Sequence, residues 1–175
     1  MDNREKAKPP ASDGDALAKA QQAYQKLLTN RQSLMLATVN ADGSPLVSYT
    51  PFAVAADKRF YIFISTLAQH TANLLRTQQA SLMLINDEAA TKQIFARQRL
   101  TFSCQAKALV RNSHNWQSAA SLYEARFGSF FNLIRNFGDF QMFRLTPQEG
   151  SLVVGFGQAY AIGGTALDEL TLRRG

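Results

Sequence analysis

The spacing of apolar residues along the chain changes near residue 30. Between Asp15 and Asn30 apolar residues recur every three or four positions, which predicts an amphipathic helix. After Ser33 they alternate with polar residues or form short runs, which predicts strands. Strands are expected over residues 33–40, 45–55, 59–65, 81–85, 97–110 and 141–145, followed by 151–154 and 157–162 as two strands or one bent strand. Further helices are expected over residues 69–77, 113–137 and 166–172.

Turn-forming residues separate these elements. Asp42 and Gly43 favour a tight hairpin, and residues 147–150 (PQEG) predict a turn. Pro51 suggests that its strand lies at a sheet edge or contains a bulge. Short, mostly antiparallel strands with helices around them predict an α+β fold built on a small antiparallel β-barrel.

Composition bounds the class of protein. The 175 residues, of which 46% are hydrophobic and 18% charged, fit a single globular domain, expected over residues 15–175. Residues 1–14 are polar and contain two adjacent prolines, which predicts a disordered tail. The single cysteine, Cys104, cannot form an internal disulfide and fits a reducing cytoplasm. No apolar run approaches the roughly 20 residues that span a bilayer, so we expect no membrane insertion and a cytoplasmic location.

The formal net charge of +6 favours anionic partners but does not identify one. Part of it lies near the chain ends, and no basic helix or RNA-binding motif accompanies it, so nucleic acid is not an expected partner. GxGxxG, P-loop, CxxC and HExxH motifs are also absent from the sequence. Two histidines, His70 and His114, and one cysteine do not readily assemble a zinc site. No nucleophile-elbow motif supports a Ser-His-Asp triad, so a hydrolase is disfavoured.

Two arginines stand out in the segment FARQRLTF, which leads into the strand expected over residues 97–110. In that strand Arg97 and Arg99 point to the same face, because side chains alternate. A planar guanidinium binds carboxylate or phosphate through two parallel hydrogen bonds, so this face is a candidate anion site. The alternatives are a solvated face, or ion pairs with Asp87, Glu88 or a partner subunit.

Several segments carry a resemblance to a known family. LATVNADGSPLVSYTPF and FYIFISTLAQHTANLLRTQQASLMLI resemble the FMN-binding split-barrel superfamily that includes pyridoxamine 5′-phosphate oxidase. DEAATKQIFARQRLTF, FGDFQMFRLTPQEG and VVGFGQAY narrow the resemblance to the HugZ/HutZ group of haem-utilisation proteins. The similarity extends over about residues 20–162, most of the chain.

The resemblance implies a homodimer of split barrels with haem in a cleft between the subunits. In this group the haem is cut oxidatively and its iron is released, which requires an electron donor. Arg99 matches the arginine of the group's FARxRLTF motif, with Arg97 beside it. Asp139 matches the aspartate that hydrogen-bonds to the axial histidine of the neighbouring subunit; a turn residue after a glycine is the plainer interpretation. The axial histidine belongs to a Gly-His pair expected at or just past Gly175, and no histidine follows His114, so the metal ligand is not assigned.

The resemblance also bears on the choice of cofactor. Ser65, Thr66 and His70 occupy the strand–helix turn in which split-barrel flavoproteins hold the FMN phosphate, although His70 also reads as a partly exposed residue at a helix start. The Arg-Lys pair usual in those flavoproteins is replaced here by Gln69 and His70, which favours haem over FMN. An FMN-binding oxidoreductase and a non-catalytic haem carrier or storage protein stay open as alternatives.

Overall fold

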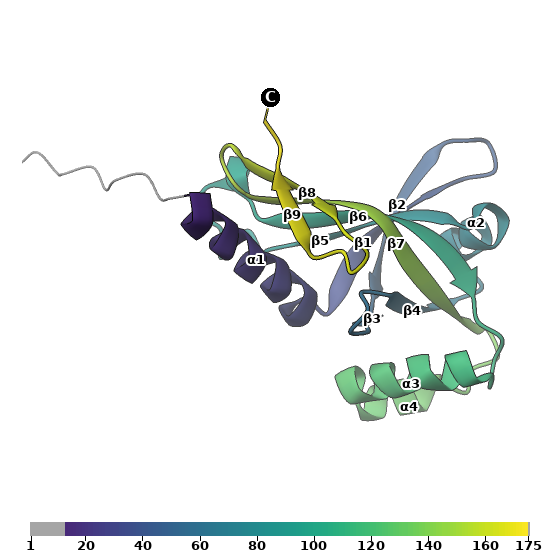
Figure 1. The fold of residues 1–175 in the computed structure, drawn as a ribbon. Helices are drawn as coiled ribbons and strands as arrows, with labels where there is room; N and C mark the ends of the chain where they lie inside the picture. Colours follow the sequence, from purple (N-terminus) through teal and green to yellow (C-terminus); the bar gives the residue numbers. More distant parts are fainter. Residues whose placement is uncertain (1–12, 175) are drawn as a thin grey trace, which may run out of the picture.

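The computed structural model describes residues 13–174 (Figure 1). Of the tail expected over residues 1–14, residues 1–12 lie outside the described residues, whereas residues 13 and 14 belong to the first helix. The helices are α1 (Asp13–Asn30), α2 (Gln69–Thr77), α3 (His114–Phe127) and α4 (Ser129–Ile134), with a short 3-10 helix η1 (Ile94–Ala96). The strands are β1 (Ser33–Val39), β2 (Pro45–Pro51), β3 (Ala53–Val54), β4 (Phe60–Ser65), β5 (Gln79–Ile85), β6 (Arg99–Ala108), β7 (Phe140–Gly155), β8 (Gln158–Gly163) and β9 (Glu169–Leu172).

All the strands join one antiparallel sheet that curls into half a barrel. Its order is β2-β1-β5-β6-β7-β4-β3, with β8 on β7 and β9 on β8. Strand β7 follows β6 along one side, while on its other side residues 140–145 pair with β4 and residues 150–155 pair with β8. The sheet therefore splits at β7 (Figure 1). The expected α+β fold, an antiparallel split barrel with peripheral helices, is confirmed.

Helices cover two separate regions of this sheet. Helix α1 packs one buried face, and α3 with α4 lies across the other end of β7 (Figure 1). Alternation in β1 shows the first layer, because Leu34 and Leu36 are buried while Met35 is 41% exposed. Large side chains of the α1 layer include Tyr24, Leu27, Phe52, Phe60, Phe102 and Phe143. Those of the α3–α4 layer include Tyr61, Phe63, Trp116, Tyr123, Phe131 and Met142.

The turn expected over residues 147–150 is wrong, because β7 runs through it as a continuous strand. Ser103 pairs with Glu149 and the next residue, Cys104, pairs with Pro147, so Gln148 is an extra residue in a β-bulge. A proline has no N–H to give to a ladder, and a bulge accommodates that loss. Pro147, which was expected to be part of a turn, therefore lies at a β-bulge inside β7, the longest strand.

The helix expected over residues 166–172 is also wrong. Residues Glu169–Leu172 form β9, and Leu170 pairs with Ile162 while Leu172 pairs with Tyr160. Leucines two positions apart fit the two-residue period of a strand, and pairing with β8 overrides the weak helical preference of so short a segment.

Other differences concern the ends of elements. The helix expected over 113–137 is interrupted at Gly128, whose φ of +58° suits glycine, and forms α3 and α4. The strand expected over 45–55 is interrupted at Phe52, and Pro51 ends β2, the outermost strand of the sheet, as an edge position allows. Among residues 13–174, no helix has the length and apolar character needed to cross a membrane.

Candidate functional site

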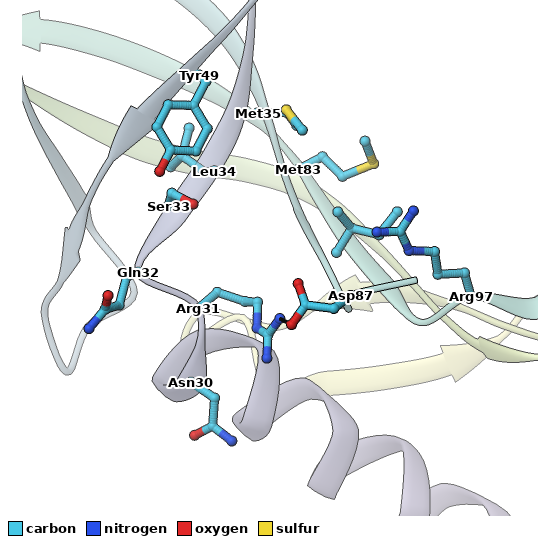
Figure 2. A pocket seen from close by; sticks show the side chains of 11 residues that line it. Asn30, Arg31, Gln32, Ser33, Leu34, Met35, Tyr49, Met83, Asp87 and Arg97 are labelled. Carbon is cyan, nitrogen blue, oxygen red and sulfur yellow. Dashed lines mark hydrogen bonds and ion pairs between the residues drawn. The ribbon is translucent and has the colours of Figure 1, made fainter. Parts of the chain in front are cut away.

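One pocket lies where the end of α1 meets the outer face of the sheet (Figure 2). It has a volume of about 370 Å³. We call it the Arg31–Arg97 pocket after its two guanidinium groups. Its lining residues are Asn30, Arg31, Gln32, Ser33, Leu34, Met35, Tyr49, Met83, Ile85, Asp87 and Arg97.

The floor of the Arg31–Arg97 pocket is apolar and comes from the sheet. Met35 of β1 lies opposite Tyr49 of β2 and opposite Met83 of β5, so the three side chains form a row across neighbouring strands. Tyr49 is 62% exposed, although a phenol ring of this size normally finds cover. This face of the sheet therefore offers apolar surface with nothing of the described chain packed on it.

The rim of the same pocket carries charge. Arg31 Nη1 lies 2.9 Å from Asp87 Oδ2, and Arg97 Nη1 lies 2.8 Å from Glu88 Oε1. The two arginine side chains are 25% and 20% exposed, whereas the carboxylates they contact are 74% and 71% exposed. Exposed ion pairs of this kind are worth about 0–1 kcal/mol, so a stronger anionic ligand can displace the carboxylates.

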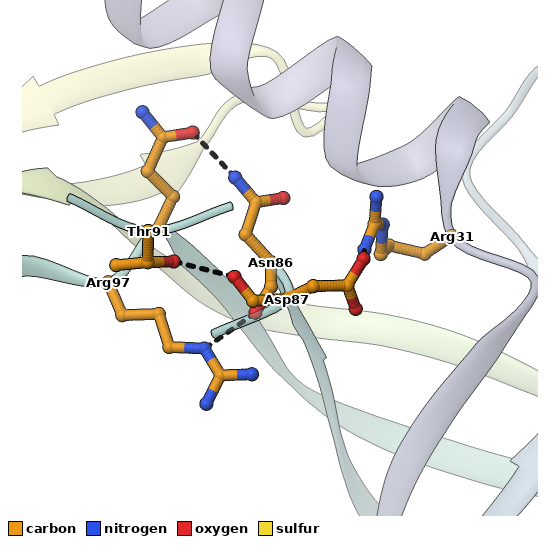
Figure 3. Close-up of polar contacts among 6 residues, drawn as sticks. Arg31, Asn86, Asp87, Thr91 and Arg97 are labelled. Carbon is orange, nitrogen blue, oxygen red and sulfur yellow. Dashed lines mark hydrogen bonds and ion pairs between the residues drawn. The ribbon is translucent and has the colours of Figure 1, made fainter. Parts of the chain in front are cut away.

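The segment that carries these carboxylates is held in place by its own polar contacts (Figure 3). Arg97 Nε donates to the main-chain oxygen of Asn86, and Asn86 Nδ2 donates to Gln98 Oε1 at 3.0 Å. Thr91 Oγ1 donates to the main-chain oxygen of Asp87 at 2.7 Å. The main-chain contact of Arg97 leaves its terminal nitrogens directed to the pocket and to Glu88, which suits binding of an anion at the rim.

Arg99 occupies a different position from Arg97. Strand β6 begins at Arg99, and Arg97 lies before it, at the end of η1, so the expected alternation within one strand does not relate the two side chains. Arg99 Nη1 donates to the main-chain oxygen of Arg97 at 3.0 Å, and Arg99 is not among the lining residues of the pocket. The ion pair with Glu88, which was one of the alternatives to an anion site for the FARQRLTF segment, is present and is made by Arg97.

The other expected site residues gather elsewhere, at the junction of β4 and α2. Ser65 Oγ donates to Asp139 Oδ2 at 3.3 Å, and the Thr66 amide donates to the main-chain oxygen of Asp139 at 2.6 Å. Thr71 Oγ1 donates to the main-chain oxygen of Ser65 at 2.6 Å, which fixes the turn. Asp139 is exposed, so most of its carboxylate stays available to a ligand or a partner subunit.

His70 lies in the first turn of α2, beside this junction. Its Nε2 is buried and has no hydrogen-bond partner within residues 13–174. Burial lowers the pKa of the His70 imidazole, because desolvation disfavours the charged form. Burial therefore favours the neutral form of the His70 imidazole. No group of three or more His, Cys, Asp or Glu in the described part of the chain has the geometry to hold a metal ion.

The two groups of residues are far apart within one chain. Ser65 pairs with Phe140 at the start of β7, whereas Arg99 pairs with Val153 near its end. The part of β7 between these pairings is about 40 Å long, at roughly 3.3 Å per residue along the strand. The structure brings Ser65, Thr66 and Asp139 together and brings none of them to Arg97.

Sequence reasoning missed most lining residues of the pocket, among them Arg31, Met35, Tyr49 and Met83. A signal for the methionines was present, because β1 and β5 carry apolar residues on both faces, as strands do when both faces become covered. No comparable signal existed for Arg31, which follows a helix and meets Asp87 only through the fold.

Comparison with known proteins supports a family assignment. The family model of pyridoxamine 5′-phosphate oxidase matches residues 20–154. The heme oxygenase HutZ of Vibrio cholerae is 43% identical over 137 residues, which cover 78% of this chain and 77% of that protein.

Solved structures agree with this assignment. The crystal structure of HutZ, described as a heme storage protein from Vibrio cholerae, superposes with a TM-score of 0.72 at 38% identity and covers 78% of this chain and 94% of that one. Campylobacter jejuni ChuZ superposes with a TM-score of 0.78 at 27% identity, over 89% of this chain and 63% of that one. A heme-binding protein from Mycobacterium smegmatis shares the fold, with a TM-score of 0.72 at 19% identity.

Proposed function

The chain belongs to the pyridoxamine 5′-phosphate oxidase family, and on that premise we propose that it is a haem-utilisation protein that binds haem in the Arg31–Arg97 pocket. Haem is here the substrate or cargo. Among its relatives, the heme oxygenase HutZ and the solved HutZ structure described as a heme storage protein are named for haem.

The observation that carries the proposal is the pairing of an apolar floor with a cationic rim. Tyr49, Met35 and Met83 form an apolar row across three strands, and Arg31 and Arg97 line the same pocket. Haem is a planar apolar macrocycle with two propionates on one side. In the proposed pose the ring lies on the row of three side chains, and each guanidinium binds a propionate through charge-assisted hydrogen bonds.

A second subunit completes the proposed site. One open sheet face covers only one side of a planar ring, and the exposed Tyr49 and Met35 leave that face available for a partner. Because about 40 Å of β7 separates Asp139 from the pocket, Asp139 and Arg97 of one chain do not reach the same ligand. In the proposed homodimer the partner subunit's Asp139 faces the haem bound by Arg97.

The proposed activity is oxidative opening of the haem ring with release of iron, in the cytoplasm and with electrons from a separate donor. Arg31 and Arg97 orient the ring through its propionates, and the apolar floor excludes water from one face. Neither His70 nor His114 lines the pocket, so the proposal assigns no iron ligand to residues 13–174. Haem binding without turnover corresponds to a carrier or storage protein and is a separate outcome of the assay.

FMN is the competing ligand, because it is the cofactor of the wider superfamily. The turn at Ser65 and Thr66 and the first turn of α2 contain no lysine or arginine, so a phosphate there lacks a fixed positive charge. This composition favours haem.

Hemin titration followed at the Soret band tests the proposal. Wild-type protein is compared with the double variant Arg31→Gln/Arg97→Gln, and each is titrated with hemin and with hemin dimethyl ester, which lacks free propionates. We expect the double variant to bind hemin about tenfold or more weakly, as the loss of charge-assisted hydrogen bonds predicts. We expect little change for the ester. Bleaching of the Soret band with ascorbate in air, together with capture of the iron by a chelator, then reports turnover.

Lys19→Gln serves as the matched control, since Lys19 is an exposed cation on α1 outside the pocket. Its hemin affinity should equal that of the wild type. A double variant that binds hemin as tightly as the wild type contradicts the proposed site, and a wild type that binds FMN but not hemin contradicts the proposed function.

A further inference from the structure

A second pocket lies on the sheet near the C-terminal end of α2 and shares no lining residue with the first. Its volume is about 500 Å³, and we call it the Lys107–Arg144 pocket. The lining residues are Gln78, Gln105, Ala106, Lys107, Arg144 and Thr146.

Two cations face each other in this pocket. Lys107 of β6 and Arg144 of β7 are directly opposite in the register of the two strands. Side chains in such pairs have Cβ atoms about 4.5–5.5 Å apart, and like charges there are destabilising. On its other side Arg144 pairs with Tyr61 of β4, so its backbone is fixed inside the sheet. The two charges therefore cannot separate by a shift of the strands.

Nothing in the described chain neutralises these charges. Neither Lys107 nor Arg144 makes a side-chain hydrogen bond or an ion pair with any residue of 13–174, and Arg144 Nε is buried without an acceptor. By contrast, Arg31 and Arg97 each contact a carboxylate. A buried donor without an acceptor is costly, so an acceptor oxygen from a bound anion would stabilise this arrangement.

The remaining lining groups define the chemistry of that partner. Gln78 and Gln105 offer amide N–H groups and Thr146 offers a hydroxyl, while no carboxylate lines the pocket. A planar guanidinium beside a compact ammonium suits a doubly charged oxyanion with several acceptor oxygens. The wall is firm, because the Ala106 amide donates to the main-chain oxygen of Gln78 at 2.8 Å and ties α2 to β6.

We propose that the Lys107–Arg144 pocket binds the phosphate group of a small phosphate monoester. The pocket measures about 500 Å³ and therefore leaves room for an organic part beside the phosphate group. The Lys107–Arg144 pocket shares no lining residue with the proposed haem site, so the two proposals are tested independently.

The test uses the whole protein with three probes at matched ionic strength: inorganic phosphate, phenyl phosphate and benzoate. Binding is followed by isothermal titration and by the NMR shifts of glutamine side-chain amides, with Gln105→Ala used to assign the Gln105 signal. We expect phenyl phosphate to bind more tightly than inorganic phosphate, benzoate to bind weakest, and the Gln105 amide to shift on binding.

Variants separate specific binding from general attraction. Lys107→Gln and Arg144→Gln should each weaken phenyl phosphate about tenfold, Arg144→Lys should restore part of that loss, and Lys19→Gln should change nothing. Lys107 is exposed, so its variant keeps the fold even if changes at Arg144 do not.

Three results would overturn the proposal. One is the absence of saturable binding by any phosphate probe. Another is equal binding by Lys107→Gln and the wild type. The third is a lower melting temperature of Lys107→Gln without any phosphate effect, which would mean that the cations only complement the C-terminal end of α2.

Discussion

The two pockets each present a pair of cationic side chains, and they differ in what surrounds those charges. In the Arg31–Arg97 pocket each guanidinium already contacts a carboxylate, and an apolar floor lies beside it. In the Lys107–Arg144 pocket the two cations are opposite each other, and the other polar groups of the lining are the amides of Gln78 and Gln105 and the hydroxyl of Thr146. The first is electrically balanced before any ligand arrives, whereas the second carries an uncompensated charge of two.

This difference separates two ways of binding an anion. At a balanced pocket the ligand competes with the internal carboxylates, so its affinity depends largely on apolar contact with the floor. At an unbalanced pocket the ligand removes an existing repulsion, so charge dominates and salt weakens binding strongly. The net charge of +6 does not distinguish the two cases, because only the local partners differ.

The largest expected effect comes from giving the second pocket the carboxylate that it lacks. Gln105 is exposed on the face that carries Lys107, so Gln105→Glu places an acidic group beside both cations. We expect the affinity for phenyl phosphate to fall more than tenfold, because the new carboxylate repels the phosphate and occupies the cations. Isothermal titration measures this, with Gln22→Glu, at an exposed glutamine of α1 outside the pocket, as the control. Unchanged affinity would show that the two cations do not determine binding.

A smaller effect is expected from the reverse change in the first pocket. Asp87→Asn releases Arg31 from its ion pair and leaves the side chain free for a propionate. Since such a pair is worth about 0–1 kcal/mol, hemin affinity should rise by up to about fivefold. Soret titration reports the change, with Glu149→Gln as a control carboxylate outside the pocket. A fall in affinity would mean that Asp87 positions Arg31 for the ligand instead of competing with it.

The smallest expected effect is on stability without ligand. Lys107→Gln removes a like-charge pair, so the free energy of unfolding should rise by about 0.2–1 kcal/mol at low salt. Urea denaturation in a buffer free of phosphate and sulfate measures the change. The gain should shrink at high salt, where the repulsion is screened. A loss of stability at low salt would contradict the assumption that the pair is repulsive.

Local chemistry explains which parts of the fold were predictable from the sequence. The hairpin at Asp42 and Gly43 is predicted by its turn residues, and α1 is predicted by the spacing of its apolar residues. Both signals are local in the sequence. The β9 strand and the bulge at Pro147 depend on pairing with β8 and β6, so no local pattern reveals them. Gly150 illustrates the same limit, because a Cβ there would lie 2.5 Å from Phe102 Cε1 of the paired strand.

The candidate site was predictable only in part. The arginines of FARQRLTF were identified from a motif, and the contact between Arg97 and Glu88 was among the alternatives considered. The motif could not show that β6 starts at Arg99, which leaves Arg97 on the pocket and Arg99 beside it. Arg31 and Tyr49 enter the pocket through the fold alone, and the Lys107–Arg144 pair follows from a strand register that the bulge at Pro147 sets.

The continuity of β7 has a consequence for how this family can diverge. One hydrogen-bonded strand connects the end that holds Asp139 to the end that pairs with Arg99, so no loop between them is free to grow or shrink. An inserted residue reverses the faces of the side chains that follow, unless a second bulge absorbs it. Substitutions can therefore change the residues at either end of β7. The distance along β7 between its two ends stays constant as long as the strand remains continuous.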